Sequence, residues 1–111
     1  MAFGYKILGQ AAPADTSNAD LYTVPSSPEV IISSLTVANV TGSEATYRIF
    51  IRDGGAAAAT TNALTYDAKV AGNSTTVISS GITLSAGDII SVRSGTANAI
   101  TFMAFGTEAT A

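Results

Sequence analysis

Residues 45–52, ATYRIFIR, alternate between two kinds of side chain with a period of two. One face would carry Ala45, Tyr47, Ile49 and Ile51, and the other would carry Thr46, Arg48, Phe50 and Arg52. This pattern is typical of a β-strand that turns one face to a core. A β-branched run at 30–39 precedes it, and the polar residues 41–44 between them predict a turn. The segment 30–52 is therefore expected to form a β-hairpin.

Other strand-like segments follow one another along the chain with turn residues between them. They lie at 4–8, 21–24, 63–70, 75–80, 89–94 and 99–105, and 81–84 runs on toward a turn at 85–88. In 63–70, Leu64, Tyr66, Ala68 and Val70 are expected to share one face. Residues 56–62 predict a loop with at most one helical turn, because Gly-Gly before the four alanines and Thr-Thr-Asn after them do not extend a helix.

Seven to eight antiparallel strands without a convincing helix indicate an all-β protein. The expected fold is a single β-sandwich of jelly-roll-like type spanning residues 1–111, in which two sheets bury their inner faces. Residues 1–20 are expected to include a loop or an extended N-terminal arm. No segment resembles a secretory leader or a membrane span, so we expect no membrane partner.

The chain contains no Cys, His or Trp. The lack of Cys excludes disulfides and thiolate metal sites, and the lack of His removes the usual proton-transfer group and metal ligand. Only 12% of the residues are charged, with a net charge of −3, whereas about 25% is usual for a soluble domain. No basic stripe is present, so nucleic acid is not an expected partner. A chain poor in charge and rich in Ala, Ser, Thr and Gly suits permanent assembly.

The eight acidic residues are scattered along the sequence. Asp53 and Asp88 adjoin glycines, where Asp commonly binds turn backbone, so structural roles are favoured over a catalytic carboxylate pair. Asp15 and Asp20 frame a loop that could hold calcium, although their spacing favours a solvated loop. The sequence thus predicts no catalytic residue, no cofactor, no metal site and no enzyme activity.

Protein-interface residues can be suggested from exposed aromatic and arginine side chains. If the opposite face of 45–52 is core, Phe50 lies outside between Arg48 and Arg52. The alternative is that Phe50 packs under an overlying loop while the arginines form ordinary surface pairs. Phe3 and Tyr5 place apolar bulk near the N-terminus and complete the predicted interface set.

Two segments resemble known families. Residues 81–92, GITLSAGDIISV, are similar to the strand-turn-strand of jelly-roll modules such as the C1q and tumour-necrosis-factor families, where Leu-x-x-Gly-Asp is frequent. The segments 4–13, 20–25, 32–39 and 45–52, together with 82–88, resemble small virion proteins of tailed bacteriophages, in particular those of cyanophages and marine phages.

The phage resemblance implies a virion structural protein, assembled in the host cytoplasm. Our first expectation is a capsid decoration or cement protein that stabilises the head. It is expected to form a homotrimer and to bind the major capsid protein or other virion proteins. A tail, baseplate or fibre component is an alternative. A carbohydrate-binding adhesin is another, although the lack of Trp counts against it.

Overall fold

The computed structural model describes the backbone of residues 2–25, 29–79 and 81–110, and within these ranges the side chains of residues 6–108. The regular secondary structure of the described part consists of strands and two short 3₁₀ turns, η1 (Asp53–Gly55) and η2 (Thr60–Asn62). The strands are β1 (Ala2–Ala11), β2 (Ala19–Thr23), β3 (Glu29–Asn39), β4 (Ala45–Arg52), β5 (Ala63–Val70), β6 (Thr75–Ile78), β7 (Ile82–Leu84), β8 (Ile89–Ser94) and β9 (Ile100–Thr110). The prediction of an all-β fold is confirmed, with nine strands where seven to eight were expected.

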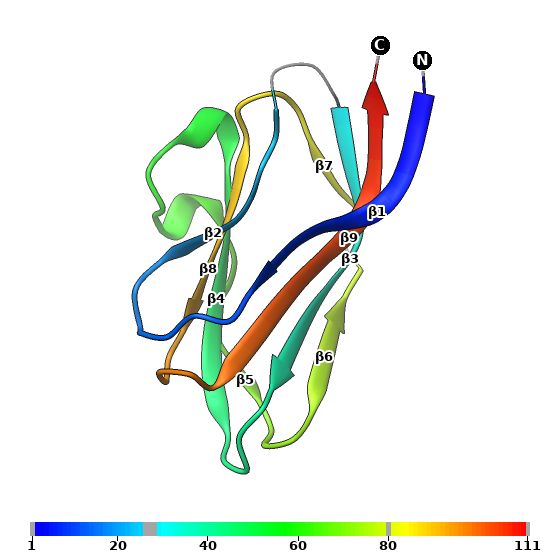
Figure 1. Cartoon of the computed structure of the whole chain (residues 1–111). Helices are drawn as coiled ribbons and strands as arrows, with labels where there is room; N and C mark the ends of the chain where they lie inside the picture. The colour runs from blue at the N-terminus through cyan, green and yellow to red at the C-terminus, as the bar shows by residue number, and fades with distance from the viewer. Residues whose placement is uncertain (1, 26–28, 80, 111) are drawn as a thin grey trace.

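The strands form two antiparallel sheets that pack face to face (Figure 1). Sheet A has the order β1-β9-β3-β6, with β7 also pairing with β3, and sheet B has the order β2-β8-β4-β5. The strand expected at 4–8 is present as the longer strand β1, whose residues 2–11 pair along β9. The loop expected within residues 1–20 is present at 12–18.

The strand order is that of a jelly roll and follows from nested pairing. β1 pairs with β9, β2 with β8, β3 with β6 and β7, and β4 with β5, as in one long hairpin whose tip lies between β4 and β5. Rolling that hairpin up brings β9 against β3 and β8 against β4, which completes the two sheets. The predicted jelly-roll-like β-sandwich is therefore confirmed.

The hydrophobic core lies between the sheets and draws on both. Its fully buried large side chains include Ile32, Leu35 and Phe102 from sheet A and Ile49, Ile90 and Val92 from sheet B. The Tyr47 ring meets Phe102 edge-on across the sandwich, with ring centroids 6.3 Å apart. Ala45, Tyr47 and Ile49 are buried, as the alternation predicted.

The predicted hairpin over 30–52 is wrong. Both strands exist, but β3 belongs to sheet A and β4 to sheet B, so the chain crosses from one sheet to the other between them. The buried side chain of Asn39 holds this crossing. Its amide donates to the carbonyl oxygens of Ser43 (2.7 Å) and Val70 (3.2 Å), and its Oδ1 accepts from Thr41. These side-chain hydrogen bonds hold the segment between β3 and β4, where a hairpin would instead have backbone hydrogen bonds between its two strands.

β1 of sheet A and β2 of sheet B approach each other closely near the start of the chain. A Cβ built on Gly9 of β1 would lie 2.1 Å from the carbonyl oxygen of Leu21 in β2. Only a residue without a side chain permits this approach. β1 can therefore cross close over β2 and still pair with β9.

Candidate interaction surfaces

The outer face of sheet B is shaped by a bulge in β5. Tyr47 pairs with Ala68 and Ile49 with Thr65, so both Tyr66 and Asp67 stand opposite the single residue Arg48. Asp67 takes a left-handed φ of 56° at this point. The bulge moves Tyr66 off the face of Leu64, Ala68 and Val70, and the expected alternation of 63–70 is broken there.

The bulge gives the Arg48 guanidinium two partners. Its Nε and Nη2 donate to Oδ1 and Oδ2 of Asp67 at 2.7 and 3.1 Å, and it stacks 3.9 Å from the centre of the Tyr66 ring. The hydrogen bonds from Arg48 are the main cause that lowers the pKa of Asp67, and the charges of Arg48 and Arg93 lower it further. Arg48 is thus held in place by an ion pair and a cation–π contact.

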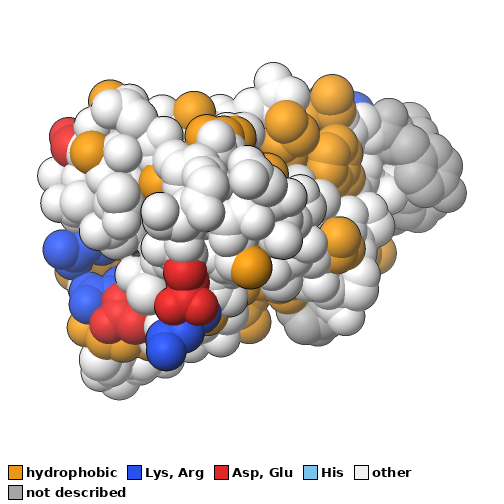
Figure 2. All heavy atoms as spheres, turned by 90° about the horizontal axis from the view of Figure 1, so that it is seen from below, with side chains coloured by type: hydrophobic (Ala, Val, Ile, Leu, Met, Phe, Trp, Pro, Cys, Tyr) orange, Lys and Arg blue, Asp and Glu red, His pale blue; other side chains and the backbone are white. Residues whose placement is uncertain are grey.

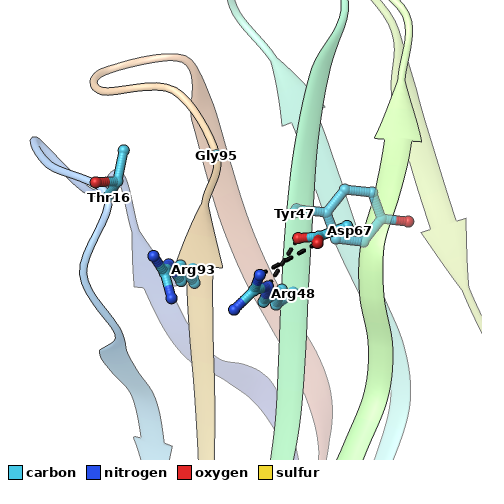
Figure 3. Close-up of a pocket in the computed structure, with 6 residues that line it drawn as sticks. All are labelled: Thr16, Tyr47, Arg48, Asp67, Arg93 and Gly95. Carbon is cyan, nitrogen blue, oxygen red and sulfur yellow. Dashed lines mark hydrogen bonds and ion pairs between the residues drawn. The ribbon is translucent and has the colours of Figure 1, made fainter. Parts of the chain in front are cut away.

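A second arginine lies directly across the sheet from Arg48. Arg93 of β8 is in register with Arg48, and both side chains lie on the side of β4 opposite to the Tyr47 ring (Figure 3). Together with Thr16, Tyr47, Asp67 and Gly95, they line a hollow of about 270 Å³. Among the described residues, no ion pair or hydrogen bond engages the Arg93 side chain.

Phe50 is 3% exposed, which corrects the prediction that it is an exposed interface aromatic. It meets Tyr66 edge-on at 6.4 Å between ring centroids. The loop that holds η1 and η2 folds back beside sheet B (Figure 1). Phe50 is thus buried, as the alternative expected, and Arg48 and Arg52 form ion pairs with Asp67 and Asp20, but the ring that Phe50 meets belongs to β5 and not to an overlying loop.

Arg52 fixes that loop to the sheet. Its Nε donates to the carbonyl oxygen of Ala56 (2.7 Å) and its Nη2 to that of Gly55 (3.2 Å). Its Nη1 bonds both Asp20 of β2 (3.1 Å) and Ser91 of β8 (3.0 Å). The donors of Arg52 are therefore used within the chain, which leaves this residue poorly suited to a partner.

The remaining predicted interface residues are Phe3 and Tyr5, whose side chains lie outside the described residues. Their backbone belongs to β1, where they pair with Ala109 and Thr107 of β9. Their interface role stays a prediction, as does that of Arg48. Arg93 was not among the residues predicted from the sequence. Its position near the end of a predicted strand, next to the turn at 95–98, was the feature that could have suggested it.

The acidic side chains with described partners act on structure. Asp88 is buried, and its carboxylate accepts the backbone N–H groups of Gly54 (2.7 Å) and Ser85 (2.9 Å), which lower its pKa. Asp15 accepts the N–H of Ser17 in its own loop. The predicted turn role of Asp88 is confirmed.

Glu108 forms an ion pair with Lys6 and accepts a hydrogen bond from the Tyr22 hydroxyl. Both contacts lower the pKa of Glu108. Burial, together with this carboxylate, raises the pKa of Tyr22.

The outer face of sheet A contrasts with that of sheet B because it is almost free of charge. Its described side chains are apolar or bear hydroxyl or amide groups, except Glu29 at one end of β3. They include Ile7, Gln10, Ile31, Thr36, Val77, Thr101, Met103 and Phe105. Ile7, Ile31 and Val77 are more than half exposed.

An end-on view shows the same division. In Figure 2 most visible Lys, Arg, Asp and Glu side chains gather at the left, which is the side of sheet B in Figure 1. The rest of that view is mainly uncharged, with several hydrophobic groups. Within the described ranges, no three acidic side chains converge as a metal site would require, and no helix has the length and apolar character to cross a bilayer.

No protein-family model matches the sequence, and no curated protein matches it. Among solved structures, it is similar to a chain from the structure of infectious bursal disease virus, Gx strain, with a TM-score of 0.45 and 10% sequence identity. The match covers 96% of this chain and 30% of that one, so this chain spans less than a third of its length. The jelly-roll assignment rests on the strand order itself.

Proposed function

We propose that this chain is a non-enzymatic structural protein of a virus particle that works by packing against neighbouring subunits. The observation that carries the proposal is the segregation of charge between the two outer faces. Burying a charged face against a protein carries a large desolvation cost, whereas a neutral face of threonine and apolar residues carries little. Sheet A offers such a face. The resemblance of the sequence to small virion proteins of tailed phages supports the same reading.

The size of this face suits a stable contact. Four strands at a spacing of about 4.8 Å give a width of roughly 15–20 Å, and ten-residue strands give a length of roughly 33 Å. The projected area is therefore about 500–650 Å², close to the ~800 Å² that each partner contributes to a standard interface. Hydroxyl and amide side chains such as Thr36 and Gln10 would supply hydrogen bonds across it.

The more specific proposal is a capsid decoration protein that attaches to the major capsid protein as a homotrimer. Each copy would bury interface across a capsid seam, and repetition over the shell would add avidity. Placement in a tail, baseplate or fibre uses the same neutral face, and copy number separates these alternatives. Hundreds of copies per particle indicate the head, and a handful indicates the tail.

The test compares two valines of equal exposure. Val77 lies on the neutral face and Val40 lies in the crossing between the sheets, and each is 62% exposed. We expect Val77→Glu to abolish binding of purified protein to expanded capsids of the encoding virus, while Val40→Glu binds like the wild type. Sedimentation with capsids gives the bound fraction, and circular dichroism checks that both variants fold.

Three results would contradict the proposal or a part of it. Immunogold labelling that finds no copies on purified particles would remove the virion assignment. Specific binding on a glycan array by the wild type, combined with no capsid binding, would favour the carbohydrate-binding adhesin instead. Equal capsid binding by both valine variants would show that the neutral face is not the contact.

A further inference from the structure

We propose that the hollow beside Arg93 binds one carboxylate, supplied by an acidic side chain of a neighbouring protein chain. The site itself does not depend on the virion assignment. Only the identification of that chain as another virion subunit rests on the proposed function.

Charge counting identifies the ligand as an anion. Two guanidinium groups, from Arg48 and Arg93, and one carboxylate, from Asp67, line the hollow and give it a net charge of +1. The chain as a whole has a net charge of −3. One further carboxylate would bring the net charge of the site to zero, whereas a phosphate dianion would make it negative.

Geometry assigns the vacant donors to Arg93. Asp67 already occupies the Nε and Nη2 donors of Arg48 in a two-point contact. Arg93 has the same planar set of donors, and no described residue accepts from them. A second carboxylate could therefore bind Arg93 as Asp67 binds Arg48.

The fold gains little from Arg93. It stands directly opposite Arg48 in the register of β4 and β8, where like charges repel. Asp67 relieves this repulsion only in part, because its oxygens are committed to Arg48. A bound carboxylate next to Arg93 would complete the balance of charge across the two strands.

The walls of the hollow favour a protein side chain over a sugar acid. Sugars usually stack on an open aromatic face, but Tyr47, the aromatic residue among those that line the hollow, is 4% exposed and turns its ring to the other side of β4 (Figure 3). Thr16 offers a hydroxyl from the loop before β2, and Gly95 presents only backbone (Figure 3). These groups suit the short, polar end of an Asp or Glu.

The test uses the three arginines of the chain, Arg48, Arg52 and Arg93, each of which has its own Nε–H signal in ¹⁵N nuclear magnetic resonance spectra. N-acetyl-glutamate methylamide is titrated into the wild-type protein at millimolar concentrations. We expect the Arg93 signal to move saturably, with the Arg48 and Arg52 signals moving at least about fivefold less, because their donors are occupied. The isosteric N-acetyl-glutamine methylamide should leave the Arg93 signal in place.

Variants locate the effect. Arg93→Gln should remove the glutamate-induced shift of the Gly95 amide, and Arg93→Lys should weaken binding about threefold or more, because lysine lacks the planar fork. Lys69→Gln removes an exposed cation elsewhere on β5 and should change nothing. Equal shifts with the glutamate and glutamine probes, or full binding by Arg93→Gln, would overturn the proposal.

Two further titrations separate the sources of the carboxylate. Galacturonate binding in place of the glutamate probe would overturn the assignment of a protein partner. Movement of the Arg93 signal with protein concentration alone would support it and identify a second copy of this chain as the donor. Saturable glutamate binding by a protein that immunogold labelling does not find on purified particles would retain the site and remove the virion assignment.

Discussion

The carboxylate of Asp88 accepts the backbone N–H of Gly54 at 2.7 Å, although 34 positions separate the two residues in sequence. The other carboxylate oxygen accepts the N–H of Ser85. One side chain thus ties the turn before β8 to the loop after β4. Since Asp88 is 8% exposed, water cannot readily replace it as an acceptor.

Asp88→Asn should lower the free energy of unfolding by about 1–3 kcal/mol. The amide nitrogen of asparagine would face the N–H of Ser85 or Gly54, which leaves one buried donor without an acceptor. Urea denaturation followed by circular dichroism measures the change. Glu44→Gln, at an exposed carboxylate, is the matched control and should stay close to the wild type.

The stability supplied by Asp88 should depend on pH. Hydrogen bonds from Gly54, then Ser85, lower the pKa of Asp88 below its ordinary value of 3.8. Its contribution is therefore fully present above that value and is lost as the pH falls through the lower pKa of the folded state. The difference in urea midpoint between wild type and Asp88→Asn should narrow from about pH 6 to about pH 3. A constant difference would show that ionisation of Asp88 is irrelevant.

Asn39→Asp should destabilise the crossing between the sheets by about 2–4 kcal/mol. The new oxygen would face the carbonyl oxygens of Ser43 and Val70, which now accept from the Asn39 amide. A buried charge without a donor is costly. Thermal unfolding above and below pH 4 tests this, because protonation of the new carboxyl should restore part of the loss.

Gly9→Ala should destabilise the sandwich by about 1–3 kcal/mol, because its Cβ would overlap the Leu21 carbonyl oxygen and push β1 from β2. Gly42→Ala provides the control. The nearest atom to a Cβ there is 3.9 Å away, so that substitution should be nearly neutral. Equal urea midpoints for the two variants would contradict the close approach of the strands.

The two arginines of the hollow should differ in their effect on stability. Arg48→Gln should lower the urea midpoint, because Asp67 loses its two-point partner and the Tyr66 ring loses its cation. Arg93→Gln should leave the midpoint nearly unchanged or raise it slightly, because no described hydrogen bond or ion pair is lost and the repulsion from Arg48 is only partly offset by the attraction to Asp67. A large loss for Arg93→Gln would indicate a structural role and weaken the carboxylate-site proposal.

Local patterns predicted the strands well. Segments 63–70 and 89–94 have the bounds expected from β-branched content and flanking turns, and the inward face of 45–52 follows its alternation. The bounds of a strand and its inward face depend on residues that are neighbours in sequence, so a periodic pattern predicts them. The jelly-roll-like sandwich followed from the number and spacing of such strands.

The pairing of strands, and the burial of side chains by distant segments, could not be predicted in the same way. The crossing at Asn39 depends on the Val70 carbonyl, which lies 31 positions away in sequence. Phe50 is buried beside Tyr66, which lies where the register of β4 and β5 shifts, and its own strand does not predict that contact. The hollow beside Arg93 likewise requires β4, β5 and β8 to lie side by side, and the sequence of a single strand does not predict that arrangement.

The position of β9 has a consequence for synthesis. β9 lies between β1 and β3, so sheet A lacks an inner strand until residues 100–110 have left the ribosome. Until then, β1 and β3 each present an unpaired edge to the cell, and those edges are open to pairing with other nascent copies. The pairs β4–β5 and β3–β6 can form early, whereas closure of sheet A waits for the last strand.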